Sequence, residues 1–231
     1  MNEIDGKKSA LLFFDMIKGF YDEVAAAKKA RLKPIVDNAA RLMKAGREAG
    51  MPIFFARGTH RADGSTSTQL LTDTDNSLAP WSHGVVTKRR VPVSLEGRTS
   101  SEIITELESR PDDYYISKYR WNAFHQTYFD LALRSKGVDT IVICGASTEM
   151  GVAATVYGAR DLDYNVIIVS DACTSLHNER VHDMFIEFVF PRMCRVRGTQ
   201  QTLNMIREAT QKAARFESAE THEESIFKSD R

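Results

Sequence analysis

Residues 141–160 read IVICGASTEMGVAATVYGAR, and this stretch decides the fold class that we expect for the chain. The apolar run Ile141–Cys144 is typical of a buried strand, and small residues follow it. From Gly151 onward, apolar side chains recur at helical spacing, at Val152, Ala153, Val156 and Ala159. The pattern predicts a strand, a tight turn and a helix. Unpaired N–H groups at the start of such a helix can hold an anionic substrate or a developing oxyanion, although other α/β proteins contain similar turns.

The length and composition limit the domain organisation and the partners that we expect. A chain of 231 residues suits one α/β domain or two small ones. Its 31 basic and 31 acidic side chains balance, so we expect neither nucleic acid nor a membrane as partner. No apolar run is long enough to span a bilayer, and no signal-peptide pattern is present. An odd number of cysteines favours a reduced, cytoplasmic setting over a disulfide framework.

The sequence also lacks a pattern for a metal or cofactor. The three cysteines form no CxxC motif, and His60 and His83 have no metal-ligand spacing. We therefore expect no metal and no cofactor.

Predicted strands and helices alternate along the chain. This order implies a three-layer α/β/α domain with a mainly parallel, Rossmann-like sheet of about six strands. We expect this domain to cover residues 1–216, followed by a polar, flexible tail at 217–231. Besides 141–144, the predicted strands are Ser9–Phe14, Met51–Ala56, Asp113–Ser117, Asn165–Ser170 and Met193–Val196. The other predicted helices are Lys33–Gly50, Ser101–Leu107, Phe129–Gly137, Val181–Phe190 and Thr199–Phe216.

Three of the predicted strand ends carry groups suited to chemistry. Asp15, Lys118 and the turn Gly145–Gly151 each follow a strand, and ligands of open parallel sheets collect at the carboxyl ends of strands. Asp15 can be a tuned acid or a helix cap, and Lys118 can be its partner or a surface lysine. Trp121 and Phe124 can form an apolar wall for a flat substrate, or they can belong to the core.

Three motifs then resemble the isochorismatase-like hydrolase superfamily, the cysteine-hydrolase fold of nicotinamidases and carbamoyl amidases. The first motif, at residues 10–20, reads ALLFFDMIKGF and is similar to the opening strand of that family. This resemblance implies that Asp15 is the catalytic aspartate. SKYRWNAFHQT at 117–127 implies that Lys118 is the catalytic lysine. The third motif spans residues 141–173 and reads IVICGASTEMGVAATVYGARDLDYNVIIVSDAC. It resembles the family's turn that carries the nucleophile, together with the strand that follows this turn.

The resemblance covers nearly the whole chain, from Ser9 to Ile206. It implies a hydrolase that acts on a small molecule without a cofactor and assembles as a homodimer or homotetramer. We expect substrate contacts from Phe20, Trp121, Phe124, Ala146 and Ser147.

One departure from the family changes the expected chemistry. Gly151 stands at the position of the nucleophilic cysteine, and glycine has no side chain to attack an amide carbon. In this superfamily, glycine at that position is a feature of true isochorismatases, which cleave a vinyl ether. In that reaction the enol-ether carbon is first protonated, and water captures the resulting oxocarbenium ion. The hemiketal then collapses and releases pyruvate, so no nucleophilic side chain is needed. Asp15 would be the general acid.

The residues before Gly151 keep other functions open. Ser147, Thr148 and Glu149 resemble the lead-in of the amidases rather than that of known isochorismatases. Three hypotheses follow: a vinyl-ether hydrolase, a C–N hydrolase in which Asp15 activates water, and a catalytically silent binding protein on this fold.

Overall fold

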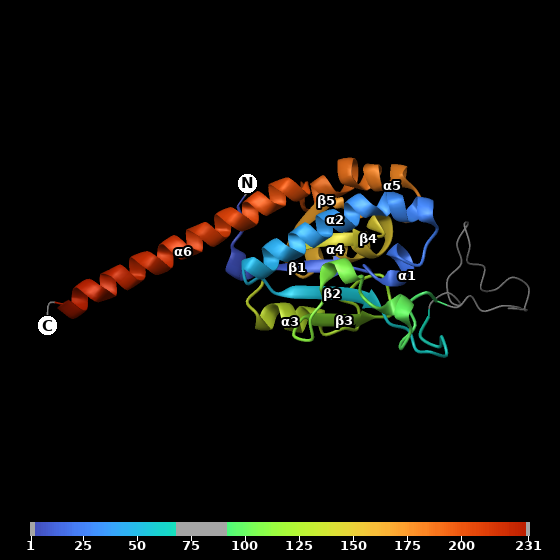
Figure 1. The fold of residues 1–231 in the computed structure, drawn as a ribbon, viewed down its shortest axis with the longest axis horizontal. Helices are drawn as coiled ribbons and strands as arrows, with labels where there is room; N and C mark the ends of the chain where they lie inside the picture. Colours follow the sequence, from blue (N-terminus) through green and yellow to red (C-terminus); the bar gives the residue numbers. More distant parts are fainter. Residues whose placement is uncertain (1–2, 68–91, 230–231) are drawn as a thin grey trace, which may run out of the picture.

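Six parallel strands form one sheet in the order β3-β2-β1-β4-β5-β6. The computed structural model describes residues 3–67 and 92–229, with the backbone alone beyond residue 214. The expected α/β class and parallel sheet are confirmed (Figure 1). The strands are β1 (Ser9–Phe14), β2 (Ile53–Gly58), β3 (Tyr114–Lys118), β4 (Thr140–Ala146), β5 (Asn165–Thr174) and β6 (Arg195–Arg197).

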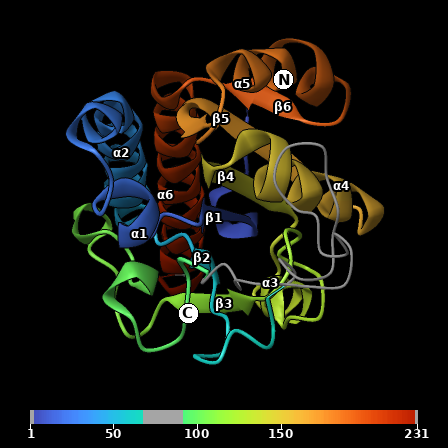
Figure 2. The same ribbon diagram turned by 90° about the vertical axis from the view of Figure 1, so that its right-hand side faces the viewer.

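Helices cover both faces of this sheet. Figure 2 shows α2 and α6 together on one side and α3 and α4 on the other. Short helical turns lie at Gly6–Lys8, Thr99–Ser101, Thr105–Leu107, Thr148–Val152, Phe185–Val189 and Phe190–Arg192. The helices are α1 (Lys18–Tyr21), α2 (Ala26–Glu48), α3 (Phe129–Ser135), α4 (Ala153–Asp161), α5 (Glu179–Met184) and α6 (Thr199–Ser229).

The central strand β1 is buried on both faces, and its side chains alternate between two cores. Leu11 and Phe13 pack into the core beneath α2 and α6, whereas Leu12 and Phe14 pack into the core beneath α3 and α4. β1 pairs with β2 on one side and β4 on the other, so the strand order reverses between β1 and β4. Ligands of such sheets bind at this reversal, beyond the carboxyl ends of the strands.

Several predicted boundaries were wrong. α2 begins at Ala26 rather than Lys33, because the alanine- and lysine-rich segment before Pro34 forms helix readily. β5 continues past Ser170 to Thr174, where Cys173 pairs with Gly145 after a shift in register.

The last helix also differs from the expectation. α6 does not end at Phe216 but continues to Ser229, so the backbone of the expected flexible tail is helical over most of its length. Figure 1 shows this helix extending well beyond the sheet. Within residues 3–67 and 92–229, no helix is both long and apolar enough to cross a membrane.

Candidate active site

Asp15 and Lys118 form an ion pair at the carboxyl ends of β1 and β3. Nζ of Lys118 lies 2.6 Å from Oδ2 of Asp15, and the two side chains are 6% and 14% exposed. The second carboxylate oxygen accepts a hydrogen bond from the backbone N–H of Gly58 at 2.9 Å. β2 separates β1 from β3, so the two side chains meet above the end of β2. Sequence motifs placed both residues at strand ends, and the structure brings them into contact.

The backbone at Asp15 is unusual for a residue with a side chain. Its φ is 49°, in the left-handed region that non-glycine residues seldom adopt. Its N–H still donates to the carbonyl of Ala56 at 2.8 Å, which holds the turn against β2. Strained conformations of this kind cluster at functional sites.

Phe14 connects the ion pair to the turn that carries Gly151. Its ring centroid lies 4.4 Å from Nζ of Lys118, a cation–π contact. The same ring occupies the space beside Gly151: a β-carbon built on Gly151 would overlap it, at 2.6 Å from Cζ. The carbonyl oxygen of Trp121 would lie 3.3 Å from that β-carbon on another side. The structure therefore leaves no room for a side chain at position 151 without a shift of Phe14.

The turn between β4 and α4 begins at Ala146, which is 1% exposed and joined to Ser147 by a cis peptide bond. The carbonyl of Ser147 accepts hydrogen bonds from the N–H groups of Met150 and Val152, at 3.1 and 3.2 Å. Two of the N–H groups around Gly151 are thus engaged within the turn. They contribute less to anion binding than the sequence pattern suggests.

Polar side chains tie this turn to the end of β5 and to α5. Ser147 Oγ accepts from the N–H of Leu176 at 3.3 Å, and Ser175 Oγ donates to Glu149 at 2.9 Å. Thr148 Oγ1 and Nδ1 of His182 are hydrogen-bonded at 2.8 Å. Ser147, an expected substrate ligand, and the amidase-like Thr148 and Glu149 are therefore held in a structural network.

The three aromatic residues expected to contact substrate lie in different surroundings. Phe124 packs on Phe129 and Tyr164, with ring centroids 4.6 and 5.7 Å apart, so the structure gives it a place in the core beneath α3 and α4. Trp121 has its backbone beside Gly151, while the residue is 56% exposed. Phe20 is half-buried and packs against the core on the α2 side. Of the three, Trp121 lies nearest to Gly151.

Sequence reasoning missed three residues of this region. Phe14 is predicted only as part of a buried strand, and Gly58 lies beyond the predicted strand Met51–Ala56. Tyr21 is 2% exposed, and burial raises the pKa of its phenol well above 10.0, with a smaller contribution from Asp15. The pairing of β2 with β1 and with β3 brings Phe14 and Gly58 to the ion pair, and no local sequence pattern reports this pairing.

The described residues include no group of three His, Cys, Asp or Glu side chains arranged to hold a metal ion. His60 is half-buried, and burial with nearby Lys118 lowers the pKa of its imidazole below 6.5. His83 lies outside the described residues.

Comparisons with known proteins agree with this architecture. A profile of the Isochorismatase domain matches residues 9–201. The uncharacterized isochorismatase family protein YecD of Escherichia coli O157:H7 is 31% identical over 211 residues, covering 89% of this chain and 100% of that protein. YwoC of Bacillus subtilis, described in the same words, is 30% identical over 204 residues, covering 88% and 97%. A cysteine hydrolase from Pseudomonas syringae pv. phaseolicola superposes with a TM-score of 0.72 at 24% identity, covering 89% of this chain and 95% of that one.

The fold is that of the isochorismatase-like hydrolases. Since the domain profile covers most of the sequence, the chain belongs to the isochorismatase family, whose members are hydrolases.

Proposed function

We propose that this protein hydrolyses a small, carboxylate-bearing or cyclic vinyl ether without a covalent intermediate. One observation carries the proposal: the Asp15–Lys118 pair is intact, while Gly151 offers no nucleophile and Phe14 fills the space of one. A site built in this way suits acid–base chemistry on a substrate that water attacks directly.

Vinyl-ether hydrolysis needs a proton on carbon and a water molecule. Asp15 as a carboxylic acid would protonate the terminal methylene carbon, and the ether oxygen would stabilise the resulting oxocarbenium ion. Water then adds to that cation and loses a proton to the Asp15 carboxylate, which restores the acid. The hemiketal collapses to an alcohol and a ketone, and for an enolpyruvyl ether the ketone is pyruvate.

Lys118 has a role at each stage of this cycle. In the resting site its ammonium group donates a short, charge-assisted hydrogen bond to Asp15. A substrate carboxylate that binds Lys118 would share this cation and would place a second negative charge beside Asp15. Lys118 would therefore hold the substrate carboxylate close to the acid.

A C–N hydrolase is the second candidate. The Thr148–Glu149 lead-in and its hydrogen bonds to Ser175 and His182 favour it, because this lead-in resembles that of the amidases. An ionised Asp15 would then act as a base toward water. Relatives carry both kinds of name: ureidoacrylate amidohydrolase RutB of Pseudomonas syringae pv. syringae is 27% identical over 180 residues, and a probable isochorismatase of Pseudomonas chlororaphis is 24% identical over 200.

The test is to incubate the protein with isochorismate and to follow pyruvate enzymatically, beside a panel of amides and ureides followed by ammonia release. We expect pyruvate, with a loss of about 10²–10⁴-fold in Asp15→Asn. Asp37→Asn is the matched control, since Asp37 pairs with Lys33 on the exposed face of α2.

The other outcomes are equally distinct. Ammonia release that depends on Asp15 would replace the ether reaction by the C–N reaction. No turnover in either assay, with a ligand that raises the melting temperature, would identify a silent binding protein. A probable inactive nicotinamidase of Arabidopsis thaliana, 29% identical over 184 residues, is a relative whose description matches that outcome.

A further inference from the structure

A large cavity lies at the edge of the sheet opposite the Asp15–Lys118 pair. Its volume is about 860 Å³, and the residues that line it include Thr140, Asn165 and Arg195, the first residues of β4, β5 and β6. Asp15 and Lys118 stand at the carboxyl ends of the parallel strands, so this cavity is separate from the candidate active site.

Three guanidinium groups line the cavity, from α4 (Arg160), from the turn after α5 (Arg192) and from β6 (Arg195). Arg160 donates to the carbonyl of Tyr164 at 3.2 Å, and Arg195 donates to the carbonyl of Glu3 at 2.7 Å. Within the described part of the chain, none of the three forms an ion pair with a carboxylate. Each guanidinium has five N–H donors in a planar fork, so donors remain for an oxyanion.

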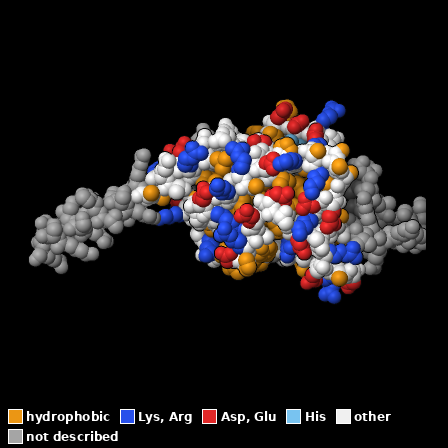
Figure 3. Space-filling view, in the orientation of Figure 1, with side chains coloured by type: hydrophobic (Ala, Val, Ile, Leu, Met, Phe, Trp, Pro, Cys, Tyr) orange, Lys and Arg blue, Asp and Glu red, His pale blue; other side chains and the backbone are white. Residues whose placement is uncertain are grey.

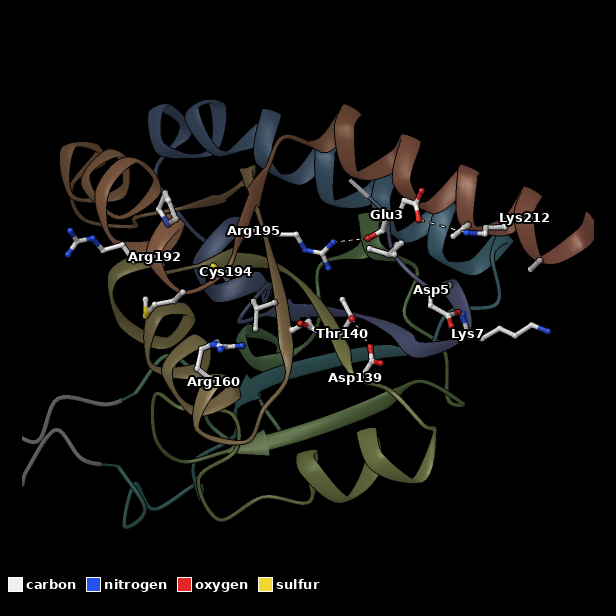
Figure 4. A pocket seen from close by; sticks show the side chains of 18 residues that line it. Glu3, Asp5, Lys7, Asp139, Thr140, Arg160, Arg192, Cys194, Arg195 and Lys212 are labelled. Carbon is white, nitrogen blue, oxygen red and sulfur yellow. Dashed lines mark hydrogen bonds and ion pairs between the residues drawn. The ribbon is translucent and has the colours of Figure 1, made fainter. Parts of the chain in front are cut away.

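The cavity also contains carboxylates, and each of these already has a donor. Glu3 pairs with Lys212 at 3.8 Å. Asp5 accepts from the backbone N–H of Lys7 at 2.9 Å, and Asp139 accepts from the hydroxyl of Thr140 at 2.7 Å. Figure 4 shows Asp5 and Lys7 at one end of the cavity and Arg160 and Cys194 at the other. The excess of positive charge therefore lies away from Asp5.

Arg195 is the most enclosed of the three arginines. It is half-buried, and burial together with nearby Arg197 lowers the pKa of its guanidinium against the opposing effect of Asp139. An anion beside it would offset the cost of holding this cation away from water. Figure 4 shows Arg195 reaching across toward Glu3, whereas Arg192 points away from the other two. Arg160 and Arg195 are therefore the pair best placed to hold one ligand.

The remaining wall is apolar, so the cavity suits more than an inorganic ion. Carbon-rich side chains come from the N-terminal segment, β5, the turn before β6 and α6 (Ile4, Val166, Pro191, Met193 and Ala209). Pockets for organic ligands combine such walls with a few placed polar groups.

We propose that this cavity is a second ligand site, which binds a small organic anion with a phosphate or carboxylate on Arg160 and Arg195 and an apolar body against the neighbouring wall. The site is independent of the reaction at Asp15.

The experiment uses the full chain, with phosphate, phenyl phosphate and benzoate as probes at constant ionic strength. Binding is measured by titration calorimetry and by the shift in melting temperature. We expect phenyl phosphate to bind more tightly than phosphate, since only the former has an apolar body. Arg195→Gln and Arg160→Gln should each weaken the binding of phenyl phosphate about tenfold, as the loss of a hydrogen bond to a charged group does.

Arg207→Gln is the matched control, because Arg207 is an exposed arginine of α6 outside the cavity, and it should bind like the wild type. Circular dichroism of each variant without ligand separates lost binding from lost folding. Tighter binding of benzoate than of phenyl phosphate would assign the anion as a carboxylate and support the site. Equal binding by all variants, or an equal effect of chloride at the same ionic strength, would overturn it.

Discussion

The ring of Phe14 occupies the space that a side chain at Gly151 would need, with Cζ only 2.6 Å from the position of a β-carbon. Phe14 belongs to β1 and Gly151 to the turn after β4, and the two are brought together because Phe14 pairs with Gly145 across these strands. The absence of a side chain at Gly151 and the position of the Phe14 ring therefore belong to one packing arrangement.

We predict that Gly151→Cys alone lowers the free energy of unfolding by about 1–3 kcal/mol, as overpacking of a core does. It should not create thiol-dependent amidase activity, because the new side chain meets the ring of Phe14. Urea denaturation measures the first effect, and ammonia release from amides measures the second.

The control for this prediction is the double variant Phe14→Val with Gly151→Cys. Removing the ring makes room for the thiol, so the double variant should be more stable than the sum of the two single changes implies. Purely additive effects would show that Phe14 and residue 151 do not compete for space.

We predict that substitutions of Asp15 and Lys118 have strongly non-additive effects on the free energy of unfolding. Asp15→Asn leaves an ammonium group that is 6% exposed without its charge partner, which should cost about 3–5 kcal/mol. Asp15→Asn with Lys118→Met removes both charges and should lose less stability than Asp15→Asn alone. Guanidinium denaturation of the wild type and the two variants measures this, and equal losses in the single and double variants would contradict the coupling.

A second ion pair joins α2 to Asp113, the residue just before β3. Arg47 makes two hydrogen bonds to Asp113, at 2.9 and 2.7 Å, and the two side chains are 15% and 4% exposed. Arg47→Met should lower the free energy of unfolding by about 3 kcal/mol, because it leaves a buried carboxylate without its cation. Lys33→Met is the matched control: its pair with Asp37 is exposed and should contribute less than about 1 kcal/mol.

Stability should fall in mild acid, in part through His182. Burial lowers the pKa of this histidine below 6.5, against the opposing effect of Asp183 and Glu149. The unfolded chain then binds a proton more readily than the folded one, so stability is fully present above about pH 6.5 and declines as the pH falls toward the folded pKa.

The measurement is the melting temperature of the wild type and of His182→Gln between pH 7.5 and pH 5. The variant should lose less stability over this range than the wild type, and Lys44→Met, which changes an exposed side chain of α2, should behave like the wild type. Parallel curves for wild type and His182→Gln would show that His182 does not contribute.

Much of the fold depends on local patterns that sequence reasoning can use. Buried strands such as Ser9–Phe14 are marked by continuous apolar runs, and the helix after Gly151 by its periodicity. Parallel strands place their carboxyl ends at one edge, so the sequence predicts a shared site for Asp15 and Lys118, whose charged groups lie 2.6 Å apart.

Which side chains occupy the same space depends on contacts between distant segments, which sequence patterns do not report. Phe124 follows Lys118 closely in sequence, yet it packs on Phe129 and Tyr164. Phe14 follows the same apolar pattern as its neighbours, yet it alone meets both Lys118 and Gly151. The arginine cavity joins the N-terminal segment, α4, β6 and α6. The physical reason is that periodicity specifies the face on which a side chain lies, whereas close packing between distant segments specifies what it touches.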